Sequence, residues 1–291
     1  MNRCLAFIGA LFCAFLTVSS ACTAQSAEWI HFTLEPNAGD PGKIHASFRS
    51  GDRGHEENNW STGFRPSDFV GLDLAGFRGA GSRVLHFAMI REAGRLDCSG
   101  HGGESYAAGY CSFTADPAFT QLLERRGIGR PTQEQAFGLM ALNARRELID
   151  AVAAAHYPMP SMNNLMALSA LNVTGDYISG MARAGYRPQS IDSLIQFKAL
   201  DITPAWIAGF VRIGYGNLAS NALIQLKALD ITPEFIAGFD RIGYRHLPVD
   251  QLVQLKAMNV TPEFVQRVAA ADASRPSIDK LVQLKAFSRR H

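Results

Sequence analysis

The chain has 291 residues, of which 47% are hydrophobic and 19% are charged, and its formal net charge at pH 7 is +2. This balance excludes a disordered chain, and without a strongly basic segment it gives no reason to expect nucleic acid as a partner. The length leaves room for more than one structural unit.

The first 27 residues have the pattern of a secretory signal peptide. Arg3 precedes an apolar run of about 14 residues, 5–18, and small residues follow up to position 24. The run is shorter than the roughly 20 apolar residues that a membrane-spanning helix needs, and no later segment approaches that length. We therefore expect an exported chain, periplasmic or secreted, without a membrane span.

Two processing outcomes remain open at the end of this segment. Cleavage near Ala24 or Ala27 would release a free protein. The stretch 19–22 also resembles a lipobox, although its first position is Ser where Leu is usual, and Cys22 would then carry a lipid anchor.

Cysteine usage agrees with export. Cys98 and Cys111 are the only two of the five cysteines that lie beyond the signal region. In an exported chain such a pair favours a disulfide, which would stabilise the domain by about 3 kcal/mol in the chain-entropy model. The alternative is two reduced thiols buried as small apolar groups.

Residues 28–115 are rich in glycine and show alternating polar and apolar residues. The alternation in 29–34, 43–49 and 84–91 predicts half-buried strands. Segments 94–101 and 109–114 read as two arms of a hairpin, which would bring Cys98 and Cys111 opposite each other. We expect a small antiparallel β domain, a curved sheet of about six strands.

A short connecting segment, 116–132, follows the predicted sheet. Asp116-Pro117 is a favourable start for a helix, which would run through Phe119 and Leu123 and end at Gly127. We expect this helix to lead into the second part of the chain.

The second part, 133–291, repeats every 29 residues. The recurring positions are Leu165, Leu194, Leu223, Leu252 and Leu281; Thr174, Thr203, Thr232 and Thr261; and Gly185-Tyr186, Gly214-Tyr215 and Gly243-Tyr244. A fixed period of this length is typical of stacked repeats. Such stacks usually present extended binding surfaces rather than catalytic pockets.

One copy of the repeat reads as a pair of helices, each of about 10 to 12 residues. Ser190 can cap the first helix, and Thr203 can cap the second with Pro204 at its first position. Gly214 would end the second helix in the left-handed conformation. We therefore predict an α+β fold, in which the antiparallel β domain is followed by an α-solenoid of two-helix hairpins.

Polar and aromatic residues also align along the predicted stack. One basic column contains Lys198, Lys227, Lys256 and Lys285, and a second contains Arg183, Arg212 and Arg241. These columns could form a cationic surface for an acidic partner, or a solvated helix face on which lysine stems cover apolar surface. We expect the tyrosine column (Tyr157, Tyr186, Tyr215 and Tyr244) to pack between repeats rather than to bind a ligand, and Trp206 to lie in the core.

Candidates for catalysis are few. The hydrophilic tract 52–59, with His55 and Glu56, could bind a metal or act in acid–base chemistry, but it reads more simply as an exposed loop. It lacks a known ligand spacing such as His-Glu-x-x-His. His31, His45 and His86 alternate with apolar residues, as outward-facing sheet residues do. We therefore predict no catalytic, metal or cofactor-binding residue and no cofactor.

The segments 202–207, 231–236 and 260–265, with the Leu-x-x-Leu-Lys-Ala stretches before them, resemble a bacterial helical repeat. In that family the repeats follow a small β domain, and 58–61 and the hairpin 98–113 also resemble its β part. Such repeats occur in envelope proteins and as C-terminal tails of some membrane metallopeptidases of the β-lactam-sensor type. The peptidase's membrane region and zinc motif are missing here, so the resemblance implies a sensing or interaction module.

Three functional hypotheses follow. The favoured one is an exported, non-catalytic cell-envelope scaffold that binds another envelope protein through its helical repeats. The second is an enzyme that acts on cell-wall or small substrates through the β domain. The third is a structural spacer without a specific ligand.

Overall fold

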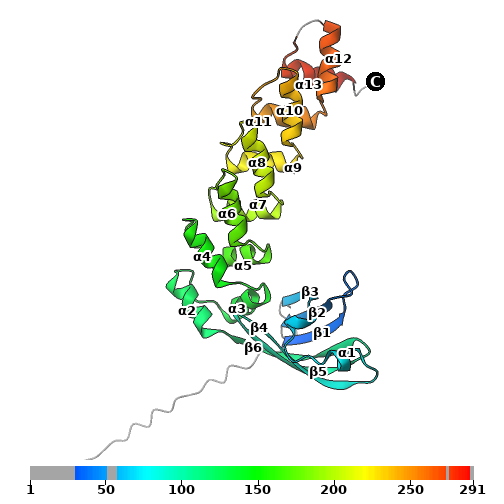
Figure 1. The fold of residues 1–291 in the computed structure, drawn as a ribbon, viewed down its shortest axis with the longest axis vertical. Helices are drawn as coiled ribbons and strands as arrows, with labels where there is room; N and C mark the ends of the chain where they lie inside the picture. Colours follow the sequence, from blue (N-terminus) through cyan, green and yellow to red (C-terminus); the bar gives the residue numbers. More distant parts are fainter. Residues whose placement is uncertain (1–29, 51–57, 273–274, 289–291) are drawn as a thin grey trace, which may run out of the picture.

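The computed structural model describes residues 30–50, 58–272 and 275–288. The signal segment, Cys22, and His55 and Glu56 lie outside these residues. The described part begins with a sheet and continues as a long column of short helices (Figure 1). The predicted α+β class is thus confirmed.

The sheet has six antiparallel strands in the order β3-β2-β1-β6-β5-β4. Two meanders of three strands are therefore joined where β1 pairs with β6. The strands are β1 (Ile30–Pro36), β2 (Ile44–Ser50), β3 (Asn58–Phe64), β4 (Arg83–Arg91), β5 (Gly94–Gly103) and β6 (Tyr106–Ala115). The short helices η1 (Pro66–Asp68) and α1 (Leu74–Arg78) lie between β3 and β4 in the chain.

Alternation along the strands separates a buried face of the sheet from an exposed one. In β1, Phe32 is buried and His31 is exposed, as the sequence pattern predicts. Phe69 contacts rings from both edge strands: its centroid lies 5.5 Å from that of Phe64 in β3 and 5.4 Å from that of Phe87 in β4. These contacts indicate that the sheet is curved toward its buried face.

A disulfide joins the two central cysteines. Cys98 in β5 is directly opposite Cys111 in β6, with 4.0 Å between the Cα atoms. Both residues are buried on the inner face of the sheet. This confirms the predicted disulfide, and a disulfide of this kind suggests an oxidising, extracytoplasmic location.

Helix α2 (Pro117–Arg125) connects the sheet to the repeats. The Asp116 carboxylate accepts a hydrogen bond from the Phe119 N–H, as expected of a residue that caps the N-terminus. Gly127 follows the helix with φ +75°, a conformation that favours glycine.

The repeat region contains eleven helices among the described residues. They are α3 (Gln133–Ala141), α4 (Arg146–Ala154), α5 (Met162–Ala170), α6 (Gly175–Arg183), α7 (Ile191–Ala199), α8 (Pro204–Arg212), α9 (Ser220–Ala228), α10 (Pro233–Arg241), α11 (Val249–Ala257), α12 (Pro262–Asp272) and α13 (Ile278–Ser288). Each odd-numbered helix packs on the next odd-numbered one, and α4, α6 and α8 stack in the same way. The helices thus form the expected stacked repeats (Figure 1).

The repeat unit differs from the expected hairpin in helix length and angle. Helices α3 to α11 have nine residues each, not 10 to 12. The chain also bends by 99° between α7 and α8, so these two helices meet nearly at a right angle. The cause of the shortening is local: a residue in the left-handed conformation follows each helix closely.

These left-handed residues are of two kinds. Asn or Asp follows the first helix of each repeat, with φ between 51° and 54°, at Asn143, Asn172, Asp201, Asp230 and Asn259. Asn and Asp tolerate this conformation better than other residues with side chains. Glycine follows the second helix in three repeats, at Gly185, Gly214 and Gly243, and His156 takes this position after α4 with φ 57°. Gly214 has φ +86°, which confirms the prediction for that residue.

The sheet and the first repeats share one hydrophobic core. A continuous cluster of buried residues runs from Ile30 in β1 to Leu194 in α7. A second cluster continues from Met181 in α6 to Leu281 in α13. The sheet is therefore the base on which the helical column is built.

Arg91, at the end of β4, links the sheet to the first repeat. Its Nη1 donates to the carbonyl oxygens of Met140 and Ala141, at 2.8 and 2.6 Å, where helix α3 ends. The guanidinium also lies over the rings of Trp60 and Phe64. Burial lowers the pKa of Arg91. A half-buried cation thus satisfies carbonyl groups that a helix end leaves without partners.

Candidate functional site

The tyrosine column joins successive repeats by hydrogen bonds. The Tyr157, Tyr215 and Tyr244 hydroxyls donate to backbone carbonyl oxygens 31 or 32 residues further along the chain. Tyr186 shares a bond of 3.2 Å with the Ser220 hydroxyl. All four rings are buried. The column therefore packs between repeats, as predicted.

The four column lysines form what we call the lysine ladder. Each ammonium lies over an aromatic ring of the preceding repeat, with Nζ 4.7 to 5.7 Å from the ring centroid. The pairs are Lys198 with Tyr177, Lys227 with Trp206, Lys256 with Phe235, and Lys285 with Phe264. All four lysines are half-buried. The aromatic residues also recur every 29 positions, so the ladder is a built-in feature of the repeat.

Arg183, Arg212 and Arg241, the arginine column, have a different environment. Their side chains are exposed. Arg212 and Arg241 donate from Nε to carbonyl oxygens of their own helices, and Arg183 donates to the Ser179 hydroxyl. None of the ion pairs between described residues includes a member of this column. The column thus presents three exposed guanidinium groups that form no close ion pair within the described part.

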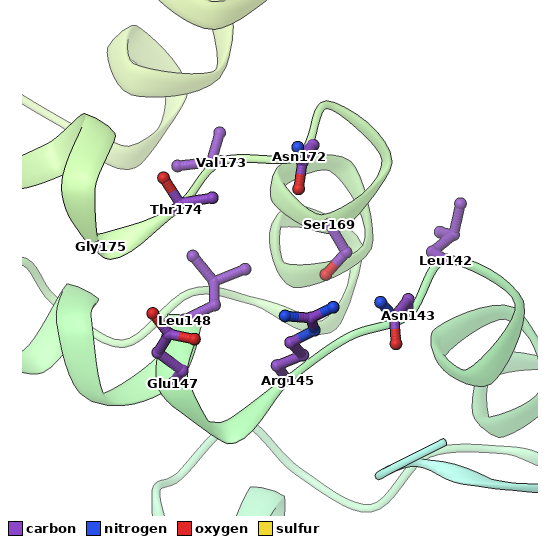
Figure 2. Close-up of a pocket in the computed structure, with 10 residues that line it drawn as sticks. All are labelled: Leu142, Asn143, Arg145, Glu147, Leu148, Ser169, Asn172, Val173, Thr174 and Gly175. Atoms are coloured by element: carbon purple, nitrogen blue, oxygen red, sulfur yellow. The ribbon is translucent and has the colours of Figure 1, made fainter. Parts of the chain in front are cut away.

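A cavity of about 200 Å³, here called the junction pocket, lies between the first repeat (α3 and α4) and the second repeat (α5 and α6) (Figure 2). Arg145 and Glu147, from the start of α4, form one wall. The other lining residues are Leu142, Asn143, Leu148, Ser169, Asn172, Val173, Thr174 and Gly175. Sequence reasoning did not identify this pocket, although four of its lining residues depart from the repeat pattern: Arg145, Leu148, Ser169 and Gly175.

The exposed face of the sheet carries polar and aromatic residues. His31 lies against Tyr110, with 4.4 Å between the ring centroids and an angle of 50° between the ring planes. His86 and His101 are also exposed, and His45 is half-buried. Within the described residues, no three His, Cys, Asp or Glu side chains gather as metal ligands would.

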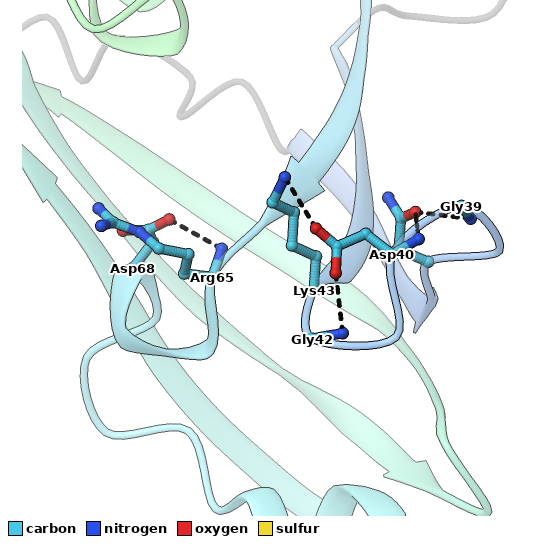
Figure 3. A network of polar contacts seen from close by, with 7 residues as sticks. Gly39, Asp40, Gly42, Lys43, Arg65 and Asp68 are labelled. Carbon is cyan, nitrogen blue, oxygen red and sulfur yellow. Dashed lines mark hydrogen bonds and ion pairs between the residues drawn. The ribbon is translucent and has the colours of Figure 1, made fainter.

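Two separate ion pairs lie near the turns of the sheet (Figure 3). Lys43 pairs with Asp40 at 3.1 Å, and Arg65 pairs with Asp68 at 3.3 Å. The hydrogen bond from Lys43 lowers the pKa of Asp40, which also accepts from the Gly42 N–H. Each pair closes a local turn over three residues, so we assign these contacts to turn stability and not to a binding site.

No single helix of the described part has the length and apolarity of a membrane span. Helices α7 and α8 have this length and apolarity only when they are counted together, and the chain bends by 99° between them.

These observations define an α+β protein in which a six-stranded antiparallel sheet carries a column of helical repeats. Comparisons with protein-family models, with curated proteins and with solved structures find no match to the chain. The family resemblance described from the sequence therefore stays an expectation.

Proposed function

We propose that this protein is an exported, non-catalytic scaffold of the cell envelope, which binds another envelope protein through its helical repeats. The signal-peptide pattern and the Cys98–Cys111 disulfide support export. The resemblance to envelope proteins with a β domain and helical repeats supports an interaction or sensing role. The mature protein is either free in the periplasm or secreted, or anchored by a lipid at Cys22.

The observation that carries the proposal is the exposure of the arginine column. The lysine ladder is half-buried and packed on aromatic rings, whereas Arg183, Arg212 and Arg241 extend from successive repeats into solvent. Stacked repeats place equivalent residues at regular intervals, so the three guanidinium groups form an extended cationic surface.

This surface fits a partner protein with an acidic, elongated face. Guanidinium groups bind carboxylates through paired hydrogen bonds, and charge complementarity accelerates association. Exposed charge pairs contribute little individually, so the proposal requires several repeats to act together.

Crosslinking in the cell envelope followed by mass spectrometry tests the proposal. The variant R183Q/R212Q/R241Q removes the three positive charges. The variant Q196E/Q225E/Q254E is the matched control, because it lowers the net charge by the same amount at exposed positions of α7, α9 and α11. We expect one acidic partner that the arginine variant loses and the glutamine variant retains.

Two results would contradict the proposal. Equal capture of the partner by both variants would exclude the arginine column as the binding surface. The absence of any specific crosslinked protein would favour a structural spacer.

A further inference from the structure

The junction pocket lies where the repeat pattern is broken. At the next four interfaces a lysine of the ladder covers an aromatic ring of the preceding repeat. At the first interface, Ser169 stands at the lysine position and Leu148 at the aromatic position. Both replacements are smaller side chains, so they leave space between the two repeats.

A second contact is also replaced at this interface. At the following three interfaces, a proline that begins the second helix packs against a glycine of the preceding repeat: Pro204 on Gly180, Pro233 on Gly209, and Pro262 on Gly238. At the first interface, Gly175 stands at the proline position and faces Ala151. The ring that would occupy this space is absent, and the Glu147 carboxylate lies beside Gly175 instead.

The walls of the junction pocket carry one positive side chain, Arg145, and one negative side chain, Glu147. The Asn143 amide lies beside the Arg145 guanidinium, and with its oxygen turned toward that group it would accept from Nε and Nη2 at 3.3 and 2.9 Å. None of the ion pairs in the described part joins Arg145 to Glu147, although both line the pocket. Leu148 and Val173 supply an apolar wall, and Ser169 and Thr174 add hydroxyl groups (Figure 2).

We propose that the junction pocket binds a small α-amino acid as its zwitterion, with the carboxylate on Arg145 and the ammonium on Glu147. A ligand with both charges satisfies both side chains without adding net charge to the pocket. The side chain of the ligand lies against Leu148 and Val173, so a small apolar side chain is favoured.

The volume agrees with this class of ligand. A cavity of about 200 Å³ is several times the space that one water molecule occupies, about 30 Å³. It is smaller than the roughly 300–1,000 Å³ of pockets that bind drug-sized molecules. A free amino acid of the size of alanine or valine falls between these limits.

Ligand binding in the junction pocket is independent of the proposed scaffold function. The pocket lies between α4 and α6 at the first interface, and the arginine column lies on the exposed side of α6, α8 and α10. Loss of ligand binding and loss of the protein partner are therefore separate measurements on separate variants.

Isothermal titration calorimetry with L-alanine, D-alanine, L-valine and D-valine tests the proposal. Isobutyrate and isobutylamine serve as analogues that lack one of the two charges. We expect saturable binding of at least one amino acid, and binding weaker by about tenfold or more for both analogues. The variants R145Q and E147Q should each weaken binding by a similar factor, and R78Q, in α1, should not change it.

The decisive variant fills the junction pocket with larger side chains. L148F/S169K restores the aromatic and lysine pair of the later interfaces, so it should abolish binding while the melting temperature stays the same or rises. The proposal is overturned if none of the four amino acids binds the folded protein at millimolar concentration. It is also overturned if an amino acid binds R145Q and L148F/S169K as tightly as the unmodified protein.

Discussion

The Tyr215 hydroxyl donates to the carbonyl oxygen of Leu247 at 2.8 Å, although 32 residues separate them. Tyr157 and Tyr244 make the same contact with Pro188 and Pro276, at 2.9 and 2.6 Å. Each bond ties the end of one repeat to the segment that precedes the first helix of a later repeat. A buried hydroxyl with a fixed partner therefore holds the stack together, in addition to its apolar contacts.

Tyr215 makes stability sensitive to high pH. Burial, together with nearby Asp240, raises the pKa of Tyr215 to about 12. The unfolded chain has a tyrosine pKa of about 10, so below pH 10 both states keep the proton. Between pH 10 and 12 the unfolded state loses its proton first, and the free energy of unfolding therefore falls. Urea denaturation at pH 8, 10 and 11, followed by circular dichroism, measures this decrease.

The variant Tyr215→Phe isolates the contribution of one hydroxyl. At pH 8 it should lower the free energy of unfolding by about 1 kcal/mol, because the Leu247 carbonyl loses its donor. From pH 10 to 11 its stability should fall less steeply than that of the unmodified protein. Parallel pH profiles for the two proteins would disprove the assigned role.

The glycine and proline contacts predict a steric penalty. A Cβ on Gly209 would lie 2.8 Å from Cγ of Pro233, closer than real Cβ atoms approach other atoms. We expect Gly209→Ala to destabilise the protein by about 1–3 kcal/mol, the usual range for overpacking. Combining it with Pro233→Ala should recover part of this loss, because Ala151 and Gly175 already form a small pair at the first interface.

A double-mutant cycle measured by chemical denaturation provides the readout. Ala205 is exposed and lies near the start of α8, the helix that contains Gly209. Ala205→Ser serves as the control and should change stability by no more than about 0.5 kcal/mol. Additive effects of the changes at Gly209 and Pro233 would show that the two residues do not compete for space.

The lysine ladder should contribute unequally to stability. Lys227→Gln removes an ammonium 5.7 Å from the Trp206 ring, which should cost about 0.5–1 kcal/mol. Lys256→Gln should cost more, because Lys256 also donates to the carbonyl oxygen of Asp230 at 2.6 Å and pairs with its carboxylate at 3.3 Å. Thermal denaturation of both variants, with exposed Arg78→Gln in α1 as a control, ranks them. A smaller effect for Lys256 than for Lys227 would contradict this order.

Arg91 should control the junction between the sheet and the repeats. Arg91→Met leaves the carbonyl groups of Met140 and Ala141 without this donor and removes the cation from the Trp60 ring. We expect a loss of about 1.5–3 kcal/mol, the range for hydrogen bonds to a charged group. Exposed Arg83 lies in the same strand, so Arg83→Met is the matched control. Equal stability of the two variants would exclude a special role for Arg91.

Periodicity in the sequence was sufficient to predict the main architecture. Alternation predicted the antiparallel sheet, and its inferred β5–β6 hairpin correctly paired Cys98 with Cys111. The period of 29 residues predicted the stack, and the Thr-Pro pairs predicted where second helices begin. These features could be predicted because each depends on local residue types at fixed spacing.

Features that depend on contacts between repeats could not be predicted in the same way. The lysines looked like a solvent-facing column, because the recurrence of Tyr177, Trp206 and Phe235 was not connected with that of the lysines 21 positions later. The bend between α7 and α8 depends partly on the left-handed conformation at Asp201, a residue type that permits this conformation without requiring it. The junction pocket results from several departures from the pattern acting together.

The hydrogen bonds of the tyrosine column have a mechanical consequence. Since every such bond joins residues 31 to 34 positions apart, a little more than one repeat, a pulling force applied at the two ends of the column would meet similar hydrogen bonds in series. The column would then extend in steps of about one unit each, and single-molecule stretching would record a sawtooth of nearly even spacing.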